Sequence, residues 1–313
     1  MVALCAAVWC VPATTLHAQG DKGGQRSFDS PDDAIKALQA ATEAKDKAAL
    51  LQIFGPGFKE LMTGDEKQDA DNAKKFAAAL AVGGKAVKNG EDKLTIEIGT
   101  NNWPMPIPLV RSGAQWRFDT DAGKEEIINR HIGRDELHAI GVCQAYVTAQ
   151  QQFAKMNPDA SGGATYALRF KSSLNKRDGL FWTTTDTEPA SPFGPLVAEA
   201  HTDGYEDVRA SRWHPFHGYF FKILTRQGKD APGGKINYLS RGKLTGGFAL
   251  VAYPEDWDKS GIMTFIVNQD GKVYQRNLGA DTLRIARGMK AYNPDADWAL
   301  TPDQGETGAV SEK

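Results

Sequence analysis

The sequence contains few cysteines. Cys5, Cys10 and Cys143 are the only three in 313 residues, and the first two lie in a segment that we expect to be removed on export. The mature chain then keeps one thiol and cannot form an intramolecular disulfide bond. A lone cysteine can be a nucleophile, but Cys143 lies in an apolar stretch with helical spacing. This setting favours a buried, inert thiol.

An excess of basic charge and a long apolar run are also missing. The 37 Lys and Arg residues are balanced by 39 Asp and Glu residues, so the net charge is -2 at neutral pH. Phosphate backbones and anionic lipid surfaces attract basic proteins, so nucleic acid is not an expected partner. No stretch approaches the ~20 apolar residues that a transmembrane helix needs, so we expect no transmembrane segment.

The sequence contains no complete catalytic motif of a common enzyme class. Gly228 to Lys235 is one residue too long for a phosphate loop. The string from Ser173 to Lys176 matches the Ser-x-x-Lys of penicillin-binding enzymes, but it lies in non-helical sequence without the companion motifs. The sequence therefore predicts no cofactor and favours a protein that is not an enzyme. Carboxylates such as Asp178 with Asp186 or Glu188 leave an unrecognised hydrolase as an alternative.

Metal-binding patterns are weak as well. His214 and His217 are three positions apart, so a strand places them on opposite faces while a loop can bring them together. Their aromatic neighbours favour packing over metal binding. His131 and Asp135 have the i,i+4 spacing of neighbours on a helix and could clamp a cation, although an exposed ion pair is the commoner arrangement. We therefore predict no metal site.

Residues 1–18 have the composition of a secretory signal peptide. Met1 to Val11 form a short apolar run, without a Lys or Arg before it, and Leu16-His17-Ala18-Gln19 follows as a cleavage site. Cleavage near Ala18 predicts a periplasmic or secreted protein. Residues 19–27 are polar and Gly-rich, as in a linker.

Residues 28–118 predict a first domain of helices and a small antiparallel sheet. Ser30 as N-cap, followed by Pro31 and Asp33, marks a helix start. Two short amphipathic helices then reach Gly55-Pro56-Gly57, and a third spans about Ala70 to Leu80. From Lys85 the apolar period changes to two. This change predicts strands around residues 94–98, 107–110 and 115–118.

Residues 119–292 predict a second domain in which a long helix covers an antiparallel sheet. The helix runs to about Met156, and Gly133 is expected to kink or break it. Strands follow at 219–224, 248–253 and 262–267, and the last two read as central strands because they are apolar on both faces. Asp270-Gly271 predicts a tight turn into the next strand. Residues 293–313 predict a mobile tail, so the fold class is α+β with two units.

Several unusual strings of this chain resemble a bacterial family catalogued only as Domain of Unknown Function family 2950. They include Trp103 to Val110, Lys176 to Trp182, His217 to Leu224 and Met263 to Gly271, and the resemblance extends from about Phe28 to Trp298. The family implies no activity. The carboxy-terminal half alone is similar to the globular heads of type IV pilins and pseudopilins, which implies a soluble pilin-like domain.

Aromatic residues in the second domain are the one suggestive feature for binding. Their grouping around Pro and Gly suggests an exposed groove for a sugar or peptide, while the alternative is a core rim built from loops. The candidate binding residues are Trp182, Trp213, His214, His217, Tyr219 and Trp257. The leading hypothesis is a non-catalytic envelope protein that binds a protein partner. A small-molecule or glycan receptor is the second hypothesis, and the oligomeric state stays open.

Overall fold

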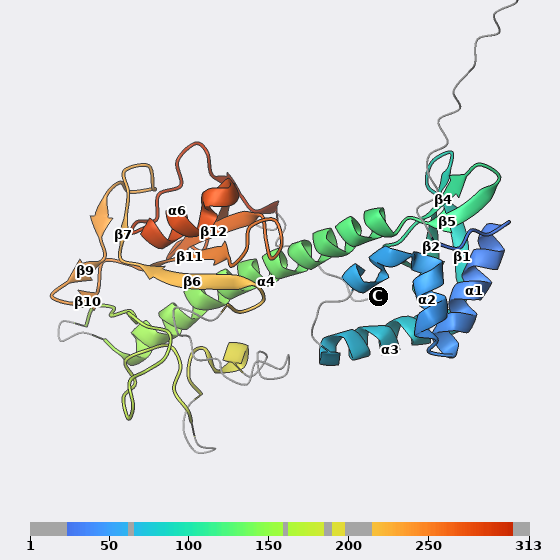
Figure 1. Cartoon of the computed structure of the whole chain (residues 1–313). Coiled ribbons are helices and arrows are strands. Elements are labelled where there is room, and N and C mark those ends of the chain that lie inside the picture. The colour runs from blue at the N-terminus through green and yellow to red at the C-terminus, as the bar shows by residue number, and fades with distance from the viewer. Residues whose placement is uncertain (1–23, 62–65, 159–161, 185–189, 198–214, 303–313) are drawn as a thin grey trace, which may run out of the picture. The chain divides into compact units, whose positions relative to one another are not determined.

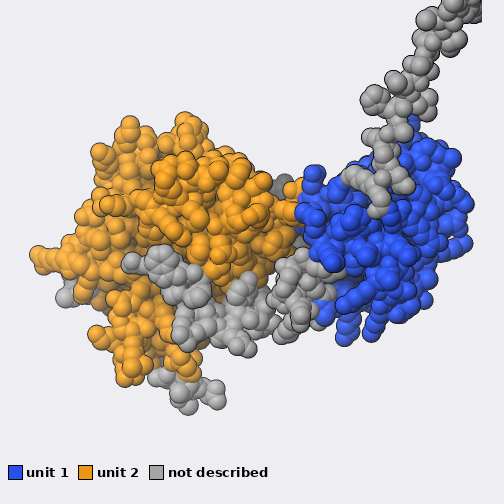
Figure 2. Space-filling view, viewed as in Figure 1, with its two compact units in different colours: residues 1–127 blue, residues 128–313 orange. Residues whose placement is uncertain are grey.

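The computed structural model describes residues 24–61, 66–158, 162–184, 190–197 and 215–302. The predicted signal peptide, most of the linker and residues 303–313 lie outside these ranges. The chain divides into two compact units, residues 1–127 and 128–313 (Figure 2). Each unit combines helices with antiparallel strands, which confirms the α+β class.

The helices of the first unit begin at the caps that the sequence predicts. Helix α1 spans Pro31–Glu43, and the Ser30 hydroxyl accepts a hydrogen bond from the backbone N–H of Asp33 at 3.1 Å. Helix α2 spans Lys47–Phe54 and starts at Asp46, whose carboxylate accepts from two backbone N–H groups. Each cap satisfies donors that the helix leaves unpaired. The helices that follow are η1 at Pro56–Leu61 and α3 at Glu66–Val82, which is longer than expected.

The sheet of the first unit has the order β1-β2-β4-β5, with β3 paired to β2, and every pairing is antiparallel. Its strands are β1 Gly84–Lys88, β2 Lys93–Ile98, β3 Trp103–Pro104, β4 Leu109–Ser112 and β5 Gln115–Phe118. Ile96, Ile98 and Phe118 are buried in one core with Leu38 of α1 and Ile53 of α2. The alternation of apolar residues thus predicted which face of the sheet the helices cover.

A single long helix, α4, spans Thr120–Met156. Of the kink or break expected at Gly133, the break does not occur, because the helix continues through that position. A glycine costs a helix only about 1 kcal/mol, and the turn that follows is held by tertiary contacts described below. The division between the compact units falls within α4, after Ile127, whereas the sequence suggested a boundary at Asp119.

The main sheet of the second unit has the order β14-β13-β12-β11-β6 and is antiparallel throughout. Its strands are β6 Tyr219–Leu224, β11 Ala249–Pro254, β12 Met263–Asn268, β13 Tyr274–Asn277 and β14 Ala299–Leu300. Gly271 adopts a φ of 77° in the turn between β12 and β13, where the Asp-Gly pair predicted it. The shorter elements are β7 Arg226–Gln227, β8 Ile236–Asn237, β9 Leu239–Ser240, β10 Lys243–Leu244, η2 Gly279–Asp281 and α6 Thr282–Gly288.

Strands β11 and β12 are buried on both faces, as their continuous apolar sequence predicted. Leu250 and Phe265 pack with Cys143 of α4, while Val251 and Ile266 lie in a separate core with Ala286 of α6. Figure 1 shows α4 and α6 on opposite sides of this sheet. Cys143 is fully buried, and burial raises the pKa of its thiol, in agreement with an inert cysteine.

The predicted tail needs correction for residues 293–302. Ala299–Leu300 form the edge strand β14, and the buried Thr301 donates its backbone N–H to the carbonyl of Val273. The Arg276 guanidinium also lies 2.8 Å from the Asp297 carboxylate. The polar composition of this segment suits an edge strand, because few residues of such a strand are buried against apolar neighbours. Among the described residues, no helix combines the length and the hydropathy of a membrane span.

Candidate functional site

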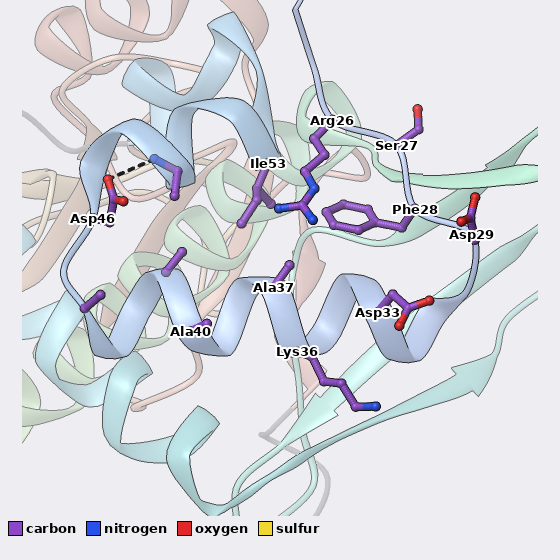
Figure 3. Close-up of a pocket in the computed structure, with 13 residues that line it drawn as sticks. Arg26, Ser27, Phe28, Asp29, Asp33, Lys36, Ala37, Ala40, Asp46 and Ile53 are labelled. Atoms are coloured by element: carbon purple, nitrogen blue, oxygen red, sulfur yellow. Dashed lines mark hydrogen bonds between the residues drawn. The ribbon is translucent and has the colours of Figure 1, made fainter.

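A groove of about 660 Å³ lies between α1, α2 and the chain segment that leads into them (Figure 3). Its floor consists largely of alanines, with Phe28 and Ile53 beside them. Small side chains leave the helix surfaces accessible to a ligand. Its lining residues are Arg26, Ser27, Phe28, Asp29, Asp33, Lys36, Ala37, Ala40, Ala41, Ala44, Asp46, Ala49 and Ile53.

The charged groups of this groove differ in their partners. Asp29 accepts a hydrogen bond from the Gln115 amide, Asp33 accepts from Ser30, and Asp46 caps α2. The exposed Arg26 guanidinium lies over the Phe28 ring, 4.9 Å from its centroid, and reaches across the groove (Figure 3). Within the described ranges, no carboxylate lies within ion-pair distance of Arg26. The acids are therefore engaged by the protein, while this cation is available to a ligand.

A second arrangement of interest lies in the second unit, where a tight hairpin leads into β6. Phe216 and Tyr219 exchange both of their backbone hydrogen bonds, and His217 and Gly218 between them have φ values of 45° and 67°. Positive φ at both central residues is the geometry of a type I′ turn. The turn places the His217 ring against His138 of α4, with a centroid distance of 4.1 Å.

His217 belongs to a cluster with Asp135 and His138 of α4. One ligand atom from each of the three residues lies within 4.8 Å of the other two. Asp135 and His138 are three positions apart, so they share a face of the helix. Asp135 is 2% exposed, and its Oδ2 atom forms no hydrogen bond with any group of the described residues; the same holds for the buried Nδ1 of His138.

The electrostatics of the cluster follow from this burial. Desolvation raises the pKa of Asp135 to about 7, and the nearby Arg134 only partly opposes the shift. Burial and Arg134 also lower the pKa of His131, which favours its neutral form. The Arg134 guanidinium can only donate to Nδ1 of His131, so the proton of the neutral ring lies on Nε2. That nitrogen is 3.1 Å from Oδ2 of Asp135, but its N–H is not aligned for a hydrogen bond to that oxygen.

Glu136 holds this turn of α4 against the sheet. Its Oε1 atom accepts hydrogen bonds from the backbone N–H groups of Ile262 and Met263, each at 2.9 Å. Gly218 lies on the other side of the cluster, where a Cβ atom would approach Oδ2 of Asp135 to 3.0 Å and Cβ of Ser260 to 2.7 Å. Helix α4, the hairpin before β6 and the start of β12 are therefore packed closely around Asp135.

Among the described residues, the predicted aromatic side chains do not gather into one groove. Trp182 and Tyr219 are 9% and 0% exposed and belong to the core beneath the sheet. For these two residues the alternative prediction, a position in the core, holds. The Tyr219 hydroxyl donates to the carbonyl of Met263. Trp257 is half-buried and donates to the side chain of Asn277. Trp213 and His214 lie outside the described residues.

Sequence reasoning missed His138 as a candidate ligand. It lies five residues before Cys143 in an apolar helical stretch, where the pattern indicated packing. The one usable signal was its i,i+3 spacing from Asp135, but the sequence pairing considered was His131 with Asp135. Of the four predicted binding residues that the structure describes, only His217 belongs to this cluster.

Comparisons with known proteins give one match. The family model described as Protein of unknown function (DUF2950) matches residues 25–301, which is most of the chain. No curated protein and no solved structure matches. The likeness of the carboxy-terminal half to pilin heads stays a prediction.

Proposed function

The chain belongs to the DUF2950 family, whose function is unknown, and from that premise we propose that it is a non-catalytic binding module of the bacterial envelope. Export is supported by the apolar run of residues 1–11 and by the small residue Ala18 before the expected cleavage site. The long helix packed on an antiparallel sheet in the second unit is compatible with the pilin-like part of the same proposal.

The groove of the first unit is the binding site in this proposal, and the observation that carries it is the available Arg26 guanidinium over an alanine floor. A guanidinium recognises a carboxylate through two parallel hydrogen bonds. The small apolar floor suits a slender chain, and the groove volume is within the range of about 300–1,000 Å³ that is typical of ligand sites. We therefore assign the groove to a peptide segment that presents a carboxylate to Arg26.

The export part of the proposal is tested by cell fractionation of the native producer. The protein is expected in the periplasmic or extracellular fraction with Gln19 as its first residue, which amino-terminal sequencing of the purified protein determines. Recovery from the cytosol with residues 1–18 intact would contradict export, and it would leave the groove proposal to its own test.

Replacing Arg26 with glutamine is expected to weaken peptide binding at least about tenfold, because a charge-assisted hydrogen-bond pair is lost. The probe is acetyl-Ala-Ala-Ala-Leu with a free carboxyl end, titrated into residues 19–313 and followed by NMR shifts of the Ala37 and Ala40 amides. The same peptide with an amidated end is expected to leave these signals in place.

Lys74→Gln is the matched control, since it removes an exposed cation from α3 outside the groove. It is expected to bind the probe like the unsubstituted protein. Equal shifts from the acid and the amide would show that the groove does not recognise a carboxylate. Unchanged binding by Arg26→Gln would show that Arg26 is not the residue that binds it.

A further inference from the structure

The cluster of Asp135, His138 and His217 combines three features of an ion-binding site. Its donors come from two segments far apart in the chain and lie within 4.8 Å of one another, and Asp135 is buried while the two histidines are partly buried. Two of its polar atoms, Oδ2 of Asp135 and Nδ1 of His138, are buried without a hydrogen-bond partner in the described part of the chain. Buried polar atoms in native proteins are nearly always satisfied, so such a pair calls for an explanation.

The protein itself compensates the Asp135 carboxylate poorly. Nε2 of His131 approaches Oδ2 to 3.1 Å, but its N–H is not aligned for a hydrogen bond to that oxygen. Arg134 donates to His131 instead. Gly218 and Ser260 occupy the space on the hairpin side of the carboxylate. A bound cation would supply the missing partner for the carboxylate and for the His138 nitrogen in one step.

The donor types identify the class of ion. Two imidazoles and one carboxylate are typical ligands of divalent first-row transition metals, whereas Ca²⁺ and Mg²⁺ prefer sites made of oxygen atoms alone. Three protein donors leave at least one coordination position for water. Ligand bonds of about 2.0–2.2 Å around a tetrahedral ion bring donors to roughly 3.4 Å from one another, so small side-chain rotations would close the observed cluster.

We propose that Asp135, His138 and His217 bind a divalent transition-metal ion, for which Zn²⁺ is the probe. The ion ties one turn of α4 to the type I′ hairpin that begins β6. His131 is a positioning residue, because its Nε2 faces the carboxylate of Asp135 from outside the cluster. The site lies in the second unit and is independent of the peptide groove.

Titration of the metal-stripped protein, residues 19–313, with Zn²⁺ tests the site. Isothermal calorimetry is expected to show one bound ion. Saturating Zn²⁺, at about 100 times the dissociation constant, is expected to raise the melting temperature by about 5–10 °C. Co²⁺ is expected to give the visible absorption of a site with nitrogen ligands, and Ca²⁺ and Mg²⁺ are expected to have no effect on melting.

Two substitutions that preserve the local structure identify the ligands. Asp135→Asn is isosteric, and His217→Asn keeps a residue that tolerates positive φ in the turn. Each is expected to weaken Zn²⁺ binding by more than about 100-fold, a loss larger than outer-shell changes produce. Asp258→Asn is the matched control. Asp258 is exposed, lies outside the cluster and has a positive φ like His217, so the substitution removes a carboxylate charge without touching the site.

Circular dichroism of the metal-free proteins establishes that both variants are folded, and His138→Gln serves as a replacement if one is not. Zn²⁺ affinity that is the same in these variants and in the unsubstituted protein would overturn the proposal. So would an absence of Zn²⁺ binding by calorimetry, or a response to Ca²⁺ equal to that to Zn²⁺. These outcomes would leave the Arg26 groove and its peptide test untouched.

Discussion

Replacing Phe265 with alanine is expected to lower the free energy of unfolding of the second unit by about 3–5 kcal/mol. Phe265 lies on the interior strand β12 and is fully buried, with its ring 5.9 Å from that of Tyr219. The substitution removes the transfer free energy of the ring and leaves a cavity beneath α4. Because β11 on one side and α4 above are held by other contacts, the cavity can collapse only in part.

Guanidinium chloride unfolding measures this loss, with circular dichroism and tryptophan fluorescence recorded together so that the transitions of the two units are separated. Leu174→Ala is the control, because the same class of truncation falls on a side chain that is 89% exposed. Its expected effect is within about 0.5 kcal/mol. Comparable losses in the two variants would mean that the face between α4 and β12 is not the core of the unit.

Replacing Glu136 with alanine is expected to cost about 3 kcal/mol. The Glu136 carboxylate accepts from two neighbouring backbone N–H groups, those of Ile262 and Met263. Truncation leaves both donors without this partner at the start of β12, and hydrogen bonds to a charged group are worth more than neutral ones. Glu136→Gln keeps an oxygen acceptor and is expected to lose less than half as much.

Amide hydrogen exchange gives a readout specific to this contact. In Glu136→Ala the amides of Ile262 and Met263 are expected to exchange faster than those in the middle of β12, since the strand start opens locally. Glu125→Ala, an exposed glutamate on the same helix, provides the control for loss of charge and is expected to change neither stability nor exchange. Unchanged protection of both amides in Glu136→Ala would show that the contact does not secure the strand.

The two stability predictions also bear on the proposed metal site. Glu136 lies between Asp135 and His138, and its hydrogen bonds orient the helix turn that carries both ligands. Loss of Glu136 is therefore expected to weaken Zn²⁺ binding about 10–100-fold, as the loss of other supporting groups does. Phe265 lies deeper in the core, so its truncation is expected to change the free energy of unfolding more than the Zn²⁺ affinity.

Local patterns in the sequence determined much of the secondary structure. Ser30 and Asp46 start helices because their side chains cap free backbone donors one turn away. The apolar runs of β11 and β12 predicted two covered faces, and the turn at Gly271 followed from its tolerance of positive φ. All of these depend on residues close together in the chain, so a linear pattern contains them.

Tertiary structure alone decided which side chains meet. Trp182 and Tyr219 are in the core although their sequence suited an exposed groove as well, and Gly133 stays helical because neighbouring residues of α4 are held against β12 and the hairpin. His138 meets His217 only because α4 and the hairpin before β6 pack together. Such contacts depend on how distant segments are packed, and the spacing of residues along the chain does not encode them.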